Sequence, residues 1–187
     1  MLRLFVALDL PDKLKDEIGL LKNELNECIK NAKWVSKDNL HFTLKFLGNC
    51  KDDILPEIKS SLKDSVELFN SFSFSLKGIG AFPTKKRARV LWVGVSEGKE
   101  AVIDLRQAIE KSLASIGFAE DKGDHSPHIT FARIRNHRDV GKVLERVETK
   151  DFSDHLVAVN SVPLFSSRLT PNGPLYEKIF EIKLKSN

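Results

Sequence analysis

The chain contains two tetrapeptides of the same design, His41-Phe42-Thr43-Leu44 and His128-Ile129-Thr130-Phe131. Each of them places an imidazole and a hydroxyl two residues apart within an apolar run that is typical of a β-strand. Because residues i and i+2 of a strand project from the same face, each motif holds a titratable base beside a hydrogen-bonding group. If the two motifs face each other across a cleft, one imidazole serves as acid and the other as base on opposite sides of a phosphorus atom. The pair therefore predicts metal-free cleavage of a phosphodiester.

The first motif lies in a segment whose apolar and polar residues alternate from 40 to 46. The alternation predicts one face of leucine and phenylalanine side chains and an opposite face that carries His41, Thr43 and Lys45. Taken alone, this strand is equally well interpreted as a solvated face with an incidental histidine.

The second motif lies in a less regular segment. Simple alternation places His128 and Thr130 on one face but moves Arg133 and Arg135 to the other face. Two interpretations stay open: the polar face ends after Thr130, or a β-bulge turns the arginines back towards it. A buried structural role is the alternative for His128 alone, but the repeated pattern in the other half of the chain favours a functional pair.

The remaining histidines are not expected to form a second site. His125 lies in a loop just before the second motif and is a candidate substrate contact, whereas His137 and His155 are expected at the surface. Neither H-x-x-x-H nor H-E-x-x-H occurs, so no metal is expected. Walker A and G-x-G-x-x-G sequences are also absent, so no nucleotide cofactor is expected.

The composition is that of an ordinary globular protein. The 187 residues are enough for a single domain spanning 1–187, with 41% hydrophobic and 30% charged residues. The net charge of +4 is compatible with nucleic-acid binding without demonstrating it. The apolar run near the start is too short for a membrane span, so a cytoplasmic protein without membrane contact is expected. Cys28 falls on the apolar stripe of an expected helix and is predicted to be a core residue.

The order of expected elements predicts an α+β fold. Strands are expected near 2–10, 40–47, 71–80, 89–95, 127–134, 156–164 and 175–184, with helices near 14–28, 54–66, 102–116 and 140–147. Each half has a long helix before its histidine strand and another after it. This order indicates a duplicated unit, with two pseudo-symmetric lobes of antiparallel or mixed sheet. The strand at 89–95 is apolar on both faces and is expected to be central.

The chain resembles the 2H phosphoesterase superfamily, and within it the bacterial and archaeal RNA 2′,3′-cyclic phosphodiesterases, long called 2′-5′ RNA ligases. The resemblance covers nearly the whole length. It is carried by both H-x-T-x motifs with their flanks (40–48 and 127–133), the opening segment (3–8), the strand near 90 (89–93) and the ending (167–176). It implies a bilobal α+β fold with helices outside and a central cleft, to which each lobe supplies one motif.

The resemblance also implies a reaction. The expected substrate is RNA with a terminal 2′,3′-cyclic phosphate, which is hydrolysed to a 2′-phosphate without metal or nucleotide cofactor. Ligation of tRNA halves through a 2′-5′ linkage belongs to the same family, and a monomer is expected. By this resemblance, His41 is the proton donor and His128 the proton acceptor. The sequence alone does not separate these two roles, because the two motifs are nearly symmetric.

Other side chains are expected to bind the phosphate. Thr43 and Thr130 are predicted to donate hydrogen bonds to its nonbridging oxygens. Lys45, Arg133 and Arg135 are candidates for neutralising RNA phosphates, with exposed surface charge as the alternative for each.

Three rival functions fit parts of the sequence. The first is a 2H enzyme that acts on a small cyclic nucleotide or an ADP-ribose cyclic phosphate. The second is a noncatalytic RNA-binding module, although arginine or lysine would suit simple phosphate binding better than paired histidines. The third is a structural protein with two core histidines.

Overall fold

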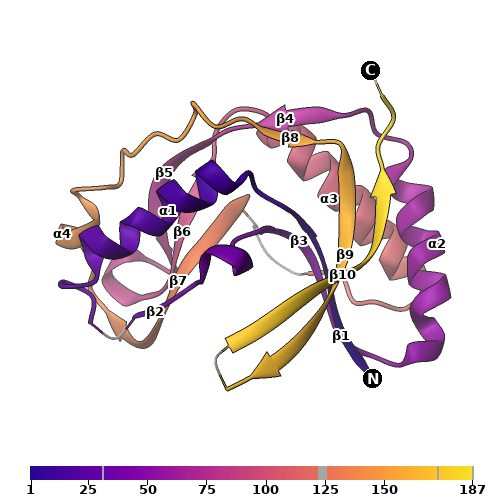
Figure 1. The fold of residues 1–187 in the computed structure, drawn as a ribbon, viewed down its shortest axis with the longest axis horizontal. Helices are drawn as coiled ribbons and strands as arrows, with labels where there is room; N and C mark the ends of the chain where they lie inside the picture. Colours follow the sequence, from indigo (N-terminus) through magenta and orange to yellow (C-terminus); the bar gives the residue numbers. More distant parts are fainter. Residues whose placement is uncertain (31, 122–125, 172, 187) are drawn as a thin grey trace.

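The computed structural model describes residues 1–30, 32–121, 126–171 and 173–186. Within these ranges the chain forms two lobes, each built on a four-stranded antiparallel sheet (Figure 1). The first sheet has the order β10–β9–β1–β3, with β1 (Leu2–Leu8), β3 (Phe42–Cys50), β9 (Ser161–Thr170) and β10 (Gly173–Lys183). The second sheet has the order β2–β7–β6–β5, with β2 (Ala32–Trp34), β5 (Leu76–Phe82), β6 (Ala88–Val95) and β7 (His128–Arg138).

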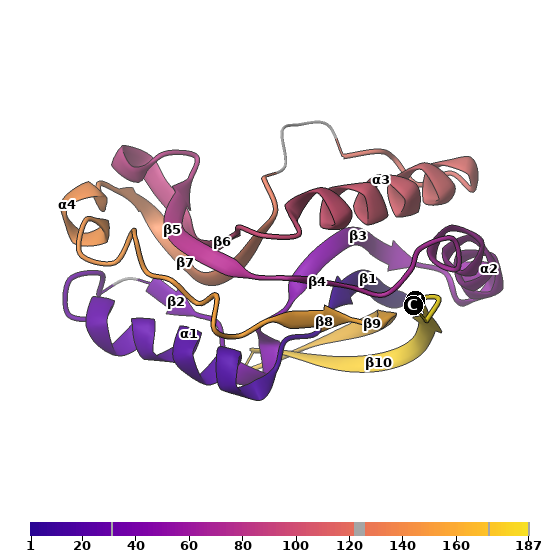
Figure 2. The same cartoon turned by 90° about the horizontal axis from the view of Figure 1, so that it is seen from above.

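Short elements and helices complete the lobes. A two-stranded sheet pairs β4 (Phe72–Phe74) with β8 (Val157–Val159). The helices are α1 (Asp12–Leu25), α2 (Leu55–Val66), α3 (Lys99–Ser115) and the single turn α4 (Gly141–Leu144), with 3₁₀ turns η1 (Lys37–Asn39), η2 (Asp52–Ile54) and η3 (Lys85–Arg87). Figure 2 shows α2 and α3 beside the first sheet and α1 and α4 at the second. The predicted α+β fold with antiparallel sheets is confirmed.

Each lobe contains strands from both halves of the chain. β1 belongs to the first sheet, but the chain then forms β2 of the second sheet before it returns with β3. Later it leaves β7 in the second sheet and ends in β9 and β10 of the first. As a result, β1 pairs on one side with β3 and on the other with β9.

The apolar patterns account for the core. β6 lies between β5 and β7, so its prediction as a central strand is confirmed. On α1, the apolar spacing of three and four residues buries Leu14, Ile18, Leu21 and Leu25. The expected continuation to Cys28 is wrong, because the helix ends at Leu25 and the following turn buries Ile29 and exposes Cys28.

Gly117 ends α3, as predicted. Its φ of 98° lies in the left-handed region, which glycine enters without steric cost. The backbone N–H of Phe118 donates to the carbonyl of Leu113, and that of Gly117 donates to the carbonyl of Ala114. These two bonds satisfy the last carbonyls of the helix and turn the chain towards β7. No helix in the described ranges has the length and apolar character needed to cross a bilayer.

Candidate active site

A β-bulge at Leu44 changes the facing of the strand that carries the first motif. Thr43 lies opposite Ala7 of β1, and Lys45 lies opposite Val6, so Leu44 is the extra residue between them. Opposed residues of an antiparallel pair share a face, whereas consecutive residues of β1 face opposite ways. Lys45 therefore points away from the face of Thr43, and the predicted alternation is wrong beyond that residue.

The same bulge brings an aromatic side chain to the motif's face. Phe46 lies opposite Phe5 of β1, and Thr43 lies opposite Ala7. Phe5 and Ala7 share a face of β1, so Phe46 and Thr43 also share a face. The Phe5 ring lies 6.1 Å from the Phe46 ring and 5.0 Å from the His41 ring, measured between centroids. His41, Thr43 and Phe46 consequently line one wall, with Phe5 behind them.

A second bulge, at Phe131, settles the open question about the arginines. Thr130 lies opposite Trp92 of β6 and Ala132 lies opposite Leu91, which leaves Phe131 as the extra residue. Ala132 is thereby moved to the face opposite Thr130. The residue that follows returns to the face of Thr130.

That residue is Arg133. It lies opposite Val90 on β6 and opposite Lys33 on β2, so Lys33 and Arg133 share the face of the second motif. The bulge interpretation therefore holds for Arg133. Arg135 is exposed and does not line the cavity described next.

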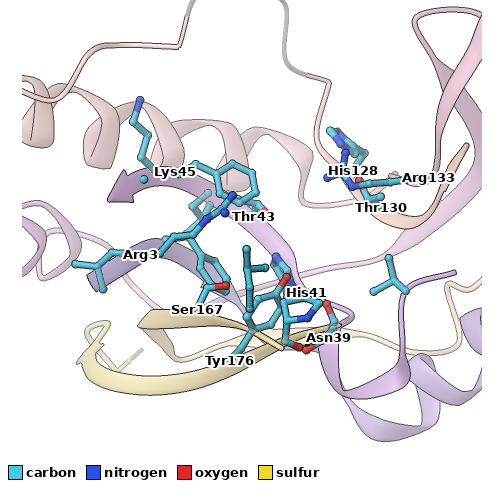
Figure 3. Close-up of a pocket in the computed structure, with 18 of the residues that line it drawn as sticks. Arg3, Asn39, His41, Thr43, Lys45, His128, Thr130, Arg133, Ser167 and Tyr176 are labelled. Carbon is cyan, nitrogen blue, oxygen red and sulfur yellow. Dashed lines mark hydrogen bonds between the residues drawn. The ribbon is translucent and has the colours of Figure 1, made fainter. Parts of the chain in front are cut away.

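Residues of both sheets line one open cavity of about 710 Å³. Figure 3 shows His41 and Thr43 on one wall and His128, Thr130 and Arg133 on the opposite wall. The cavity thus brings together the two motifs that the sequence singled out. Its lining also includes residues that no motif indicated, among them Arg3, Lys33, Asn39, Phe46, Ser167 and Tyr176.

Both imidazoles are oriented by the same kind of hydrogen bond. The Nδ1 atom of His41 lies 2.7 Å from the carbonyl oxygen of Asn39, and that of His128 lies 2.8 Å from the carbonyl oxygen of Ser126. A carbonyl oxygen only accepts, so Nδ1 carries the hydrogen in each ring. Nε2 is then the nitrogen that accepts a proton, or donates one once the ring is charged.

Aromatic rings pack against each imidazole. The Tyr176 ring meets His41 edge-on at 5.3 Å, and the Phe82 ring meets His128 in the same way at 4.8 Å. Trp92 lies 6.1 Å from His128 and packs on Gly80, where a Cβ would come within 2.2 Å of the indole. Glycine at position 80 is therefore needed for the indole to lie where it does.

The apolar neighbours of His41 affect its charge. Burial beside Phe5 and Tyr176 lowers the pKa of His41, and this effect outweighs the opposing hydrogen bond to Asn39. A lowered pKa means that the folded protein binds this proton less readily than the unfolded chain does. Its contribution to stability is therefore present above the ordinary value of about 6.5 and is lost as the pH falls through the lowered pKa.

We expect the imidazole of His41 to titrate below about pH 6.5 in an NMR titration of its ring protons. The substitution Tyr176→Ser should raise this pKa towards the ordinary value, because it opens the ring to water. A wild-type midpoint at or above 6.5 would contradict the role assigned to burial.

Comparison of the sequence with models of protein families identifies the family of this chain. The model described as LigT like phosphoesterase matches the chain twice, at residues 8–92 and 93–176. The chain is a LigT-like phosphoesterase. Each match contains one of the two motifs, in agreement with the predicted duplication and with the resemblance to 2H phosphoesterases.

Relatives of similar length support the same family. A protein of Thermotoga maritima is 35% identical over 185 residues, covering 98% of this chain and 96% of its own. A protein of Methanothermobacter thermautotrophicus is 33% identical over 175 residues, covering 93% and 94% of the two chains. Both relatives are named RNA 2′,3′-cyclic phosphodiesterase.

Solved structures share the fold. A crystal structure from Thermus thermophilus superposes with a TM-score of 0.83 at 24% identity and covers 99% of both chains. The LigT protein of E. coli, in complex with 3′-AMP, superposes with a TM-score of 0.77 at 24% identity and covers 98% of both chains.

Lys45 of this LigT-like phosphoesterase borders the cavity, but protein groups hold its charged end. Its side chain is 2% exposed, and its Nζ donates a hydrogen bond to Oε1 of Glu110 at 2.9 Å and forms an ion pair with Oε2 at 2.8 Å. The same atom lies 2.6 Å from the carbonyl oxygen of Ala119 and 3.3 Å from the carboxylate of Asp121. Arg106 also contacts Asp121, at 3.4 Å. This network ties β3 to α3 and to the segment that leads towards β7.

We expect Lys45→Met to destabilise the protein by about 3 kcal/mol, because it leaves the largely buried carboxylate of Glu110 without its counter-charge. Urea denaturation measures the loss. The matched variant Lys77→Met breaks an exposed pair with Asp151 and should cost less than about 1 kcal/mol. An unchanged stability together with a raised KM for Lys45→Met would instead support the sequence-based prediction of a substrate contact.

The sequence did not indicate two of the cations at the cavity. Arg3 shares a face with Phe5 because the two residues are two apart on β1, and alternation within that strand was the available signal. Lys33 reaches the cavity because β2 pairs with β7, and such a register is not visible in the sequence. Asn39 has a further role, since its side chain donates to the carbonyl of Pro174 and joins η1 to β10.

Of the other histidines, His155 does not line this cavity, and the side chain of His137, predicted to lie at the surface, is outside the described part of the chain. His125 lies outside the described residues. His155 contacts the carboxylate of Glu17 at 2.7 Å. Within the described part of the chain, no group of His, Cys, Asp and Glu side chains is arranged to hold a metal ion.

Proposed function

We propose that this LigT-like phosphoesterase hydrolyses the 2′,3′-cyclic phosphate at the end of an RNA chain to a 2′-phosphomonoester. One observation carries the proposal: two imidazoles with the same backbone anchor lie on opposite walls of one cavity, each with a threonine beside it. This arrangement supplies an acid and a base for displacement at phosphorus. The names of the relatives support a cyclic phosphate of RNA as the ester.

In the proposed mechanism, Nε2 of His128 takes a proton from water as the water oxygen attacks phosphorus. The bond between phosphorus and the 3′ oxygen breaks on the opposite side, and Nε2 of His41 donates the proton that this oxygen needs. The products are a 2′-phosphate and a 3′-hydroxyl. The two histidines end with exchanged protonation states, which solvent restores before the next turnover.

The proposed roles of the other residues follow from their faces. Thr43 and Thr130 lie beside the imidazoles, and among the described residues neither hydroxyl has a hydrogen-bond partner. They are available to donate to the nonbridging phosphate oxygens, where charge is held during the reaction. Arg133 shares the face of Thr130 and neutralises the reacting phosphate.

The test uses an RNA that ends in a 2′,3′-cyclic phosphate, incubated with the protein in the presence of EDTA. A product with a 2′-phosphate and a 3′-hydroxyl is expected. The double variant His41→Ala/His128→Ala, purified in the same way, controls for contaminating nucleases. A 3′-phosphate product would contradict the proposed bond cleavage, and no turnover would contradict the proposed substrate.

Three further expectations describe the setting of the reaction. Ligation of tRNA halves, a monomeric state and a cytoplasmic location remain predictions from the sequence. Ligation is tested by incubating the protein with two RNAs, one ending in a 2′,3′-cyclic phosphate and the other beginning with a 5′-hydroxyl.

A further inference from the structure

We propose that the cavity contains a second nucleotide subsite, formed by Phe46 and Arg3, which binds the nucleotide preceding the cyclic phosphate end. The inference rests on the proposed function and goes beyond it, because it makes an RNA of at least two nucleotides a better substrate than a cyclic mononucleotide. Phe46 stacks on the base of that nucleotide, and Arg3 neutralises the phosphate that joins it to the terminal one.

Phe46 is an aromatic side chain without a role in the core. It is 58% exposed, although its strand neighbours Leu44 and Leu47 are buried. The bulge at Leu44 turns it onto the cavity wall, where its ring packs against Phe5, which also packs against the ring of His41. Exposed aromatic rings beside a basic groove are the usual means of binding single-stranded RNA, because every base has a face on which to stack.

Arg3 supplies the positive charge at the same end. Its side chain is exposed at the cavity, and none of the described residues forms an ion pair with it. Arg3 lies two residues before Phe5 on the same face of β1, a step of about 7 Å along the strand. Its guanidinium is therefore displaced from His41 in the direction of Phe46.

The positions of Arg3 and Arg133 indicate which end of the cavity takes the rest of the RNA. A terminal cyclic phosphate has a neighbouring nucleotide on one side only, so the strand leaves the catalytic pair in a single direction. Arg133 shares the face of His128 and serves the reacting phosphate. Figure 3 shows Arg3 on the opposite side of His41 from Arg133, where a second phosphate has room to bind.

The experiment compares kcat/KM for three substrates: a 2′,3′-cyclic mononucleotide, the dinucleotide with the same end, and that dinucleotide with an abasic 5′ residue. The wild-type protein should prefer the complete dinucleotide. Phe46→Ala should lower kcat/KM on the complete dinucleotide by about tenfold, and much less on the other two substrates.

Arg3 is tested through the linking phosphate. Arg3→Gln should also act selectively on the dinucleotide, and its effect should disappear when a neutral methylphosphonate replaces the linkage. The salt dependence of dinucleotide binding should become shallower by about 0.7 in the log–log slope, as expected for one lost phosphate contact on a single strand.

Two matched substitutions outside the cavity serve as controls. Leu68→Ala removes an exposed apolar side chain, and Arg168→Gln removes an exposed positive charge on β9. Neither should change the preference for the dinucleotide. Equal losses of Phe46→Ala on mono- and dinucleotide would place the terminal base on Phe46 and overturn the subsite. Equal wild-type activity on both substrates would also overturn it while leaving the proposed function intact, whereas activity on neither would defeat the proposed function itself.

Discussion

Replacing either His41 or His128 by alanine is expected to lower kcat on a cyclic phosphate end by about 10²–10⁴-fold or more. Alanine neither takes up nor releases a proton, so the attacking water loses its base or the leaving oxygen loses its acid. Single-turnover measurements at saturating substrate give the effect on the chemical step. The double variant should be little worse than the single variants, because the two groups act in one step.

The roles of the two histidines are separated by changing the leaving group. A substrate with sulfur in place of the 3′ bridging oxygen releases a thiolate, which needs no proton from an acid. His41→Ala should therefore recover most of its lost activity on this substrate, whereas His128→Ala should not. Recovery by His128→Ala alone would show that the donor and acceptor are assigned the wrong way round. Melting temperatures of the variants verify that each one is folded.

Replacing Thr43 or Thr130 by valine is expected to lower kcat by about 10²–10³-fold each, the usual cost of removing one donor to a developing negative charge. Valine keeps the shape of threonine and removes its hydroxyl. The loss should appear mainly in kcat rather than KM, because the hydrogen bond strengthens as charge accumulates on the phosphate in the transition state.

Thr84→Val provides the control for this substitution. Thr84 is exposed and lies outside the cavity, so its variant should keep wild-type kcat. If Thr43→Val and Thr130→Val raise KM and leave kcat unchanged, the hydroxyls bind the ground state only. In that case the proposed stabilisation of the transition state is wrong.

The meeting of the two motifs in one cavity was predicted better than the direction in which individual side chains face. Two pairs of an imidazole and a hydroxyl in strand-like segments were sufficient to indicate a cavity that both pairs line. The position of β6 was also predictable, since a strand that is apolar on both faces fits only the interior of a sheet. These features depend on local residue patterns, and local patterns are what a sequence displays.

The facing of individual side chains was predicted less well, for a physical reason. A bulge depends on how many residues of one strand oppose those of its neighbour, and this register is a property of the pair. Alternation within a single strand therefore misplaced Lys45 and left Arg133 undecided. Cys28 was misplaced because α1 ends one turn earlier than its apolar stripe suggested.

The position of β1 between β3 and β9 has a consequence for how the protein is made. β1 leaves the ribosome well before β9, so one side of β1 has no partner while the residues between the two strands are synthesised. An unpaired edge of this kind is a template for aggregation. Nascent chains that stop before β9 should therefore be both inactive and poorly soluble.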